Sequence, residues 1–141
     1  LENITLVRDD ATKLDSLGTQ VFDKVFVDAP CSAWGTISKN PDAKYARDYA
    51  EIRRLAQNSY KILSKAAQHV KPGGEVIFYT CTLSPIENQQ TINKFLAAFP
   101  EYYIPPDLPL SMANLTVDAG VEIMPYYFNS EGGFVCRMVK R

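Results

Sequence analysis

The sequence is poor in histidine, in cysteine and in net charge, and each shortage excludes a class of protein. It has one histidine, three cysteines and a formal net charge of −1 in 141 residues. One histidine with scattered cysteines provides no ligand set for a transition metal, so we expect no metal site. An odd number of cysteines makes no disulfide framework, which favours reduced thiols in a cytosolic or nuclear compartment. With so little net charge, nucleic-acid binding would depend on a local basic patch, or on parts of the protein outside this chain.

Long hydrophobic runs and targeting signals are missing as well. No apolar stretch approaches the length that crosses a membrane, and the first residues lack the basic region of a secretory signal. We therefore expect no membrane partner. The length supports one hydrophobic core, and 46% hydrophobic with 22% charged residues is ordinary for a globular domain. Because the chain begins with Leu1 rather than methionine, we expect it to be part of a longer protein.

Two short cysteine motifs are the most informative feature of the chain. Asp28-Ala29-Pro30-Cys31-Ser32 follows the apolar residues 25–27, and Thr80-Cys81-Thr82 follows the apolar residues 76–79. Runs of this kind are typical of strands buried in parallel sheets. A long amphipathic segment separates them, which indicates a strand, a crossover helix and a second strand, with the two strands as parallel neighbours. Both cysteines then lie at the carboxyl edge of the sheet, where open α/β sheets place their active sites.

The hydrophobic pattern predicts an alternation of strands and helices. The first three strands are expected at residues 4–7, 23–28 and 75–80, and the helices at residues 48–70 and 84–99. Pro72-Gly73-Gly74 is expected to end the first helix, and a capping box from Ser84 to Glu87 to open the second. Residues 121–124 and 134–139 should pair as a terminal β-hairpin, and residues 29–44 and 100–114 should be loops. The predicted fold class is α/β, the second half of an open sheet with a C-terminal antiparallel hairpin.

These residues resemble a known family, the RNA 5-methylcytosine methyltransferases of the NOL1/NOP2/Sun group, also called Fmu or RsmB-like. Besides the two cysteine motifs, the resemblance includes Asp10-Ala11, Gly35, Asn40-Pro41-Asp42, Pro72-Gly73-Gly74, Pro85, Glu87-Asn88 and Gly133-Phe134-Val135. It implies a Rossmann-like fold with S-adenosyl-L-methionine as cofactor. It also implies an RNA substrate, ribosomal or transfer RNA, and a cytoplasmic location, or a nuclear or nucleolar one in a eukaryote. Residues 1–141 would be the C-terminal part of the catalytic domain.

The resemblance also assigns roles to single residues. Cytosine C5 is too weak a nucleophile to take a methyl group from a sulfonium unaided, so a thiolate must first add to C6. By resemblance, Cys81 makes this attack and Cys31 releases the methylated product. Asp28 would be the carboxylate that faces both the cytosine and the cofactor. Asp10 would receive the adenine amino group, and Pro30 would complete the cofactor contacts.

Each of these site residues also has a purely structural explanation. Cys31 and Cys81 could be buried core thiols, since free cysteine is commonly a core residue. Asp28 could cap a helix or brace a loop. Asp10, like its neighbour Asp9, could simply stabilise a turn after a strand. On the sequence alone these alternatives stay open.

Three other features of the sequence receive structural explanations. Cys136 alternates inward in the last predicted strand and should be a core residue. Glu87 and Asn88 are explained by the capping box and are assigned no chemistry. A local basic cluster could meet phosphates beside the active site, but a solvated helix face explains it at least as well. This cluster consists of Lys39, Lys44, Arg47, Arg53 and Arg54.

Two departures from the family pattern keep other functions open. Ala33-Trp34-Gly35 stands where the family has a Gly-rich stretch, and Trp34 would stack on a base there or narrow the pocket. The family's Gly-rich cofactor loop, its ribose-binding acid, its neighbouring lysine and its N-terminal RNA-binding region would precede Leu1. One alternative is therefore an inactive fragment or interaction module that keeps the family fold. Another is a thiol redox enzyme using Cys31 and Cys81, although such enzymes usually carry both cysteines in one short motif.

Overall fold

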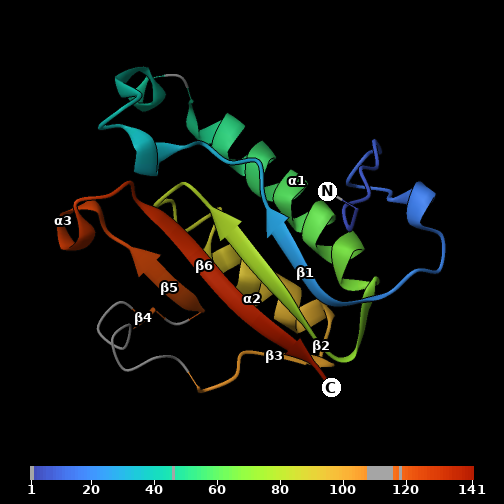
Figure 1. Cartoon of the computed structure of the whole chain (residues 1–141). Helices are drawn as coiled ribbons and strands as arrows, with labels where there is room; N and C mark the ends of the chain where they lie inside the picture. Colours follow the sequence, from blue (N-terminus) through green and yellow to red (C-terminus); the bar gives the residue numbers. More distant parts are fainter. Residues whose placement is uncertain (1, 46, 108–115, 118) are drawn as a thin grey trace.

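The computed structural model describes residues 2–45, 47–107, 116–117 and 119–141. These residues form a mixed sheet of six strands in the order β1-β2-β6-β5-β4, with β3 added beside β6 (Figure 1). The strands are β1 (Phe22–Asp28), β2 (Val70–Thr80), β3 (Tyr102–Tyr103), β4 (Thr116–Val117), β5 (Gly120–Ile123) and β6 (Gly133–Lys140). The helices are α1 (Tyr49–Ala67), α2 (Gln89–Ala98) and the single turn α3 (Pro125–Phe128), with short 3₁₀ turns at Asp15–Leu17, Trp34–Thr36 and Pro41–Lys44.

The first two strands and the helix between them form the expected parallel unit. β1 pairs with β2 in parallel, with Val27 beside Phe78 and Asp28 beside Tyr79. Both strands therefore end at the same edge of the sheet, where each is followed by one of the cysteine motifs. β6 pairs antiparallel with β2, and β5 pairs antiparallel with β6. The α/β fold class and the terminal antiparallel hairpin are confirmed.

Helix α1 forms where the hydrophobic period predicted a helix, but it ends earlier than expected. Asp48 caps its start by accepting the Glu51 N–H at 2.8 Å. Its buried side chains recur at helical steps and face the sheet. They are Ile52, Leu55, Ala56, Ser59, Leu63, Ala66 and Ala67. The prediction that the helix reaches residue 70 is wrong, because the His69 carbonyl already accepts the Phe22 N–H at 2.7 Å, just before β2 begins.

Pro72, Gly73 and Gly74 do not end the helix, because they lie inside β2. The register between β1 and β2 breaks at this point, so the extra residues of β2 form a bulge. Proline is tolerated at such a bulge, and Gly73 takes the left-handed φ of 77°. A Cβ on Gly74 would lie 2.8 Å from the Asp23 carbonyl oxygen, so the close approach of the two strands requires glycine.

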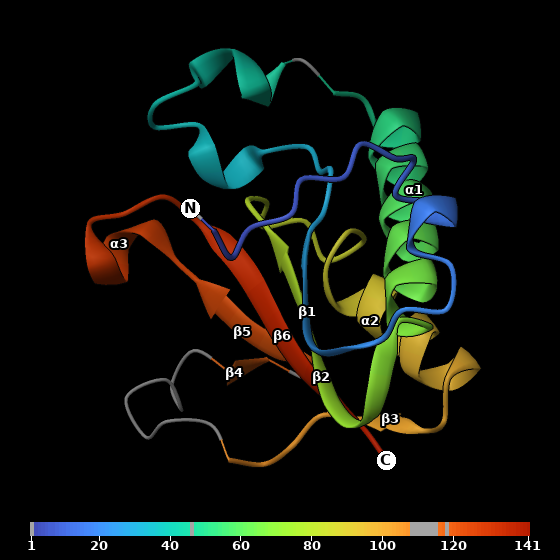
Figure 2. The same ribbon diagram turned by 45° about the vertical axis from the view of Figure 1, so that its right-hand side comes forward.

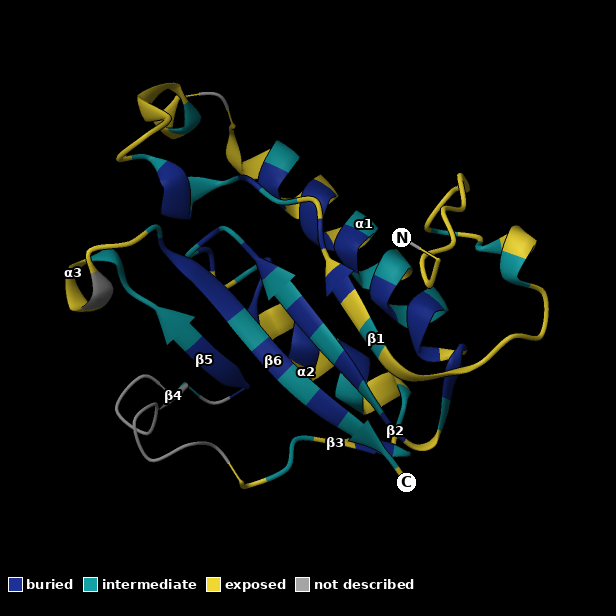
Figure 3. Ribbon diagram, viewed as in Figure 1, coloured by how far each residue is buried: buried dark blue, intermediate teal, exposed yellow. Residues whose placement is uncertain are grey.

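The two faces of the sheet are covered unequally. Figure 2 shows α1 and α2 together on one side of the sheet. The side chains that pack beneath them, among them Val76, Phe78 and Phe134, are fully buried. On the opposite face the same strands present half-buried or exposed residues (Figure 3), and Phe26 of β1 is 63% exposed. In the described part of the chain, neither long helix covers that face.

The predicted strand at residues 4–7 is wrong. These residues have no strand partner among those that the structure describes, and Leu6 is 92% exposed. A strand needs a neighbour to satisfy its backbone hydrogen bonds, so an apolar run without one stays irregular. The N-terminal segment, residues 2–20, instead contains local turns, in one of which the Asp10 carbonyl accepts the N–H groups of Lys13 and Leu14.

Two smaller differences concern a loop and a helix start. The predicted loop at residues 100–114 contains the short strand β3, and its residues 108–114 lie outside the described residues. Helix α2 begins at Gln89 rather than near Pro85, because residues 85–88 form turns. Neither difference changes the edge of the sheet at which the cysteine motifs meet.

Candidate active site

The side chains of Cys31 and Cys81 meet at the carboxyl edge of β1 and β2. Their sulfur atoms lie 3.3 Å apart, and both thiols are free and partly buried. Cys31 lies in the loop after β1, and Cys81 directly follows the last residue of β2. The predicted convergence of the two cysteines is therefore confirmed.

Backbone contacts hold the loop of Cys31 against the loop of Cys81. The Gly35 N–H donates to the Cys81 carbonyl at 3.0 Å, and the Gly35 carbonyl accepts the N–H of Gly132, which precedes β6, at 2.8 Å. Position 35 requires glycine, because a Cβ there would overlap the carbonyl oxygen of Gly132. The loop that carries Cys31 is thus fixed to the ends of both β2 and β6.

A buried carboxylate, Glu87, joins the residues that follow the two cysteines. It accepts the Ser32 N–H at 2.7 Å and the Ser32 hydroxyl at 2.6 Å. The Thr82 hydroxyl lies 2.8 Å from the Ser32 hydroxyl and donates to the same carboxylate at 3.4 Å. All three side chains are buried. Because Ser32 follows Cys31 and Thr82 follows Cys81, these three residues, the Glu87 cluster, hold the two thiols near each other.

The Glu87 cluster corrects the predicted capping box. A capping box requires the Glu87 side chain to return to the backbone of Ser84. Instead the carboxylate binds Ser32, and the Ser84 N–H donates to the Thr82 hydroxyl at 3.3 Å. Sequence reasoning missed this residue because the spacing from Ser84 to Glu87 already had a complete local explanation.

Asn88 braces the loop of Cys81 from both sides. Its amide oxygen accepts the Thr80 hydroxyl at 2.6 Å, and its amide nitrogen donates to the Thr82 carbonyl at 2.9 Å. Asn88 is fully buried. Its two contacts fall on the residues immediately before and after Cys81, so it fixes the backbone from which that thiol projects.

Burial changes the acidity of Cys31. Desolvation raises the pKa of this thiol to about 12, opposed by the backbone N–H of Ala33 and reinforced by Cys81. At neutral pH Cys31 therefore keeps its proton, and the 3.3 Å contact allows it to donate that proton toward the Cys81 sulfur. Burial, together with the nearby charges of Cys81 and Asp28, also raises the pKa of Tyr79.

Asp28 and Pro30 are exposed at the end of β1. Asp28 pairs with Tyr79 in the register of the sheet, and within the described part of the chain no hydrogen bond engages its carboxylate. The Pro30 carbonyl accepts the Ser59 hydroxyl of α1 at 2.7 Å, which ties the loop to the helix. An exposed carboxylate at the carboxyl end of a strand is available to a ligand.

The structure gives Asp10 local partners. Its carboxylate accepts the N–H and the hydroxyl of Thr12 at 2.9 and 2.7 Å, and Asp9 accepts those of Ser16 at 2.7 and 2.5 Å. These hydrogen bonds lower the pKa of both carboxyls. Both residues are exposed, and among the described hydrogen bonds none joins them to the cysteine loops. The turn explanation accounts for these contacts, and binding of a cofactor by Asp10 stays a prediction.

Other residues singled out in the sequence are structural. Cys136 is buried in β6, where desolvation raises the pKa of its thiol to about 12, so it is a core residue as expected.

Over the described ranges, no cluster of histidine, cysteine and acidic side chains could hold a metal ion. In the same ranges, no helix combines the length and the apolar character that crossing a membrane requires.

Comparison with known proteins identifies the family of this chain. The family model for the 16S rRNA methyltransferase RsmB/F matches residues 1–139. The chain belongs to this family. One relative, the probable ribosomal RNA small subunit methyltransferase B of Bacillus subtilis (strain 168), is 35% identical in an alignment of 139 positions that covers 94% of this chain and 31% of that protein. The ribosomal RNA small subunit methyltransferase B of Klebsiella pneumoniae (strain 342) is 36% identical over 124 residues, which are 88% of this chain and 27% of that protein.

A solved structure of the Sun group shares the fold of this RsmB/F family member. The crystal structure of NSun6 from Pyrococcus horikoshii with SFG matches 99% of this chain and 35% of that one, with a TM-score of 0.79 at 25% identity. The resemblance inferred from the two cysteine motifs and the Rossmann-like fold are thus confirmed. The chain spans about a third of the length of the relatives that it matches.

Proposed function

We propose that the protein containing this chain is an RNA methyltransferase that methylates cytosine at C5 through a covalent bond between Cys81 and C6. The observation that carries the proposal is the pair of cysteines from separate motifs, 3.3 Å apart at the carboxyl edge of two parallel strands. Membership of the RsmB/F family supports RNA as the substrate. The relatives named for the small ribosomal subunit favour ribosomal RNA over transfer RNA.

The proposed reaction needs a sulfur nucleophile and a way to release it. Cys81 adds to C6 as a thiolate, which forms a C–S bond and raises the electron density at C5. Release then requires loss of the C5 proton and cleavage of the C–S bond. Cys31 is suited to this step: it gives its proton to the departing Cys81 sulfur, and the thiolate so formed takes the C5 proton. Its raised pKa makes Cys31 a poor nucleophile at neutral pH but a strong base once deprotonated.

The residues at the end of β1 fit one side of S-adenosyl-L-methionine. The exposed Asp28 carboxylate, which no described hydrogen bond engages, can accept N–H groups of the cofactor, and Pro30 offers an exposed apolar surface close by. Asp10 would accept the adenine amino group, as the resemblance implies. When bound, the cofactor supplies the electrophilic methyl group. SFG, the analogue of S-adenosylmethionine named with the NSun6 structure, supports this cofactor.

A thiol redox function is the second candidate, and the 3.3 Å contact between the two sulfur atoms favours it too. The two functions differ in what they consume. A methyltransferase needs RNA and a methyl donor, whereas a redox enzyme would cycle a disulfide between Cys31 and Cys81 with neither. An interaction module that only keeps the fold would bind RNA without using either thiol.

Methyl transfer to RNA tests the proposal. Full-length protein is incubated with labelled S-adenosyl-L-methionine and unmodified ribosomal RNA, and the digested RNA is separated into nucleosides. We expect the label in 5-methylcytidine, none with Cys81→Ala, and activity retained in the control Cys136→Ala. Label in a different nucleoside, or full activity in Cys81→Ala, would overturn the proposal.

A further inference from the structure

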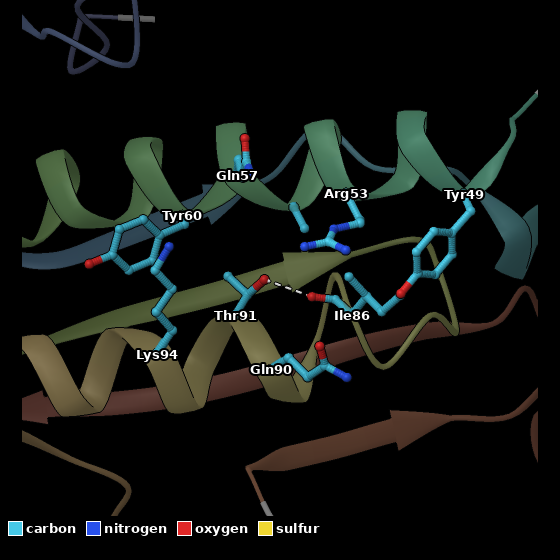
Figure 4. Close-up of a pocket in the computed structure, with 9 residues that line it drawn as sticks. Tyr49, Arg53, Gln57, Tyr60, Ile86, Gln90, Thr91 and Lys94 are labelled. Carbon is cyan, nitrogen blue, oxygen red and sulfur yellow. Dashed lines mark hydrogen bonds between the residues drawn. The ribbon is translucent and has the colours of Figure 1, made fainter.

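A groove between α1 and α2 is lined by cations, tyrosines and amides, none of which the cysteine chemistry uses. It has a volume of about 370 Å³. Helix α1 contributes Tyr49, Arg53, Gln57 and Tyr60, and helix α2 contributes Gln90 and Lys94 (Figure 4). The residues from α1 recur at steps of three and four, so they form one stripe along the helix.

The two cations of the groove have no acidic partner. Over the described ranges, no carboxylate lies within 4.0 Å of Arg53 or Lys94, and no acidic residue lines the groove. Their neighbours on α1 differ, because Arg47 and Arg54 pair with Glu51 at 3.8 and 2.7 Å. The structure thus divides the basic cluster of the sequence. Arg47 and Arg54 share the single carboxylate of Glu51, whereas Arg53, with no acidic partner among the described residues, adds positive charge to the groove.

Each cation of the groove lies over a tyrosine ring. The Lys94 Nζ is 4.2 Å from the centre of the Tyr60 ring, and the Arg53 guanidinium carbon is 5.8 Å from that of Tyr49. Tyr49 is 63% exposed, so its ring is accessible to a ligand. Positive grooves with aromatic faces are typical of sites that bind single-stranded nucleic acid, since the cations contact phosphates and the bases stack on the rings.

The groove begins near the cysteine edge of the sheet. Helix α1 starts at Tyr49, after the loop that carries Cys31, and the turn before α2 follows the loop of Cys81. Figure 1 shows the start of α1 on the same side as the ends of β1 and β2. Tyr49 and Tyr60 lie about 16 Å apart along the helix, at 1.5 Å per residue. An RNA strand whose cytosine reaches Cys81 would therefore meet the groove as it leaves the site.

We propose that this groove binds the single-stranded RNA next to the target cytosine. Arg53 and Lys94 contact its phosphates, and the exposed ring of Tyr49 stacks on a base. The proposal deepens the proposed function and rests on it, since it concerns the same RNA substrate. It assigns binding alone to the groove, with no part in bond formation.

The test compares two double variants that each remove two positive charges. Arg53→Gln/Lys94→Gln changes the groove, and Arg54→Gln/Lys61→Gln is the matched control outside it. Binding of a fluorescein-labelled single-stranded RNA to full-length protein is measured by anisotropy at several salt concentrations. We expect the groove variant to bind about tenfold more weakly. The plot of log K, the association constant, against log salt concentration has a negative slope. Its magnitude should decrease by about 1.4, because two phosphates of the RNA are no longer neutralised. The control should change both quantities far less.

A third variant separates stacking from charge. Tyr49→Ala, which removes the exposed ring, should weaken binding of the same RNA while leaving its salt slope unchanged, because a stacked base releases no counterion. Melting temperatures close to that of the parent would show that the variants fold.

The possible failures of the two proposals are distinguishable. The proposed role of the groove would be wrong if the groove variant and its control had equal effects, or if the groove variant kept the affinity and salt slope of the parent. Either result would leave RNA methylation by the parent protein untouched. A parent protein that binds no RNA and methylates none would overturn both proposals.

Discussion

Two segments of this chain carry the predicted site residues, and they are built in opposite ways. The cysteine edge, residues 28–36 and 80–88, is held by buried side chains from distant parts of the sequence, since Ser32 and Glu87 are 55 positions apart. In the N-terminal segment, residues 2–20, Asp10 binds Thr12, only two positions away. The same kind of hydrogen bond therefore fixes tertiary geometry at the cysteine edge, and a turn in the N-terminal segment.

The two segments also differ in how much their hydrogen bonds contribute to the stability of the fold. A carboxylate away from water is costly unless its hydrogen bonds are made, and Glu87 is fully buried with its partners Ser32 and Thr82. The exposed Asp10 loses little when water replaces Thr12. Substitutions at the cysteine edge should therefore have large effects, and those in the N-terminal segment small ones.

Glu87→Ala should have the largest effect. It leaves the Ser32 N–H and one hydroxyl proton of the Ser32–Thr82 pair buried without an acceptor, since these two hydroxyls can still bond to each other, and it opens a cavity. We expect a loss of about 3 kcal/mol in the free energy of unfolding. Urea unfolding of the full-length protein, followed by circular dichroism, measures it. The matched control is Asp10→Ala, which should leave the urea midpoint unchanged; equal shifts would remove the difference between the segments.

Gly35→Ala should have the next largest effect. The added methyl group would overlap the Gly132 carbonyl, so the loop has to move away from Cys81. We expect a loss of about 2 kcal/mol in stability, and slower formation of the disulfide between Cys31 and Cys81 under mild oxidation.

Gly18→Ala in the N-terminal segment is the control for Gly35→Ala. No atom lies within 4 Å of the added carbon, and only the left-handed φ of 54° is strained. Stability should fall by about 1 kcal/mol because of this backbone strain, and the rate of disulfide formation should stay the same. An unchanged rate in Gly35→Ala would show that this glycine does not control the distance between the thiols.

The raised pKa of Cys31 predicts a smaller effect that depends on pH. Burial raises the pKa of this thiol from its usual 9.0 to about 12, so the folded state keeps a proton that the unfolded state releases. The stability contributed by the protonated thiol is complete below pH 9 and is lost as the pH rises toward 12. Across this pH range the urea midpoint of Cys31→Ala should fall less steeply than that of the parent. The urea midpoint of Asp10→Ala should fall as steeply as that of the parent. Identical slopes in all three proteins would contradict the raised pKa.

Leu6→Ser should have the smallest effect on stability. Leu6 is 92% exposed and belongs to the segment that forms no strand among the described residues. Removing its apolar surface costs no burial, so the thermal midpoint of this chain should not change. A clear drop in the midpoint would mean that residues 4–7 pack against the domain in solution.

Sequence patterns predicted the cysteine edge only in part. The strands around residues 25–28 and 76–80 and the helix between them follow from hydrophobic period, which reports burial directly. The meeting of Cys31 and Cys81 then follows from the parallel pairing of these two strands, which places both carboxyl ends at one edge of the sheet. The Glu87 cluster could not be predicted in this way, because no linear spacing reveals that Ser32 is the partner of Glu87.

The N-terminal segment shows why composition alone can mislead. Residues 4–7 have the composition of a strand, but a strand forms only where a neighbouring strand pairs with it.

Pro72-Gly73-Gly74 has the composition of a helix end and lies in a β-bulge instead. Proline and glycine mark an interruption of regular structure without saying which kind it is.

Covalent trapping of RNA tests the central claim most directly. Full-length Cys31→Ala is incubated with S-adenosyl-L-methionine and ribosomal RNA, then run on a denaturing gel. Because attack by Cys81 and methyl transfer remain possible while release is impaired, we predict a slowly migrating band that ribonuclease removes. Cys81→Ala and the double variant Cys31→Ala/Cys81→Ala should give no such band. A band with Cys81→Ala and none with Cys31→Ala would contradict the assignment of the nucleophile.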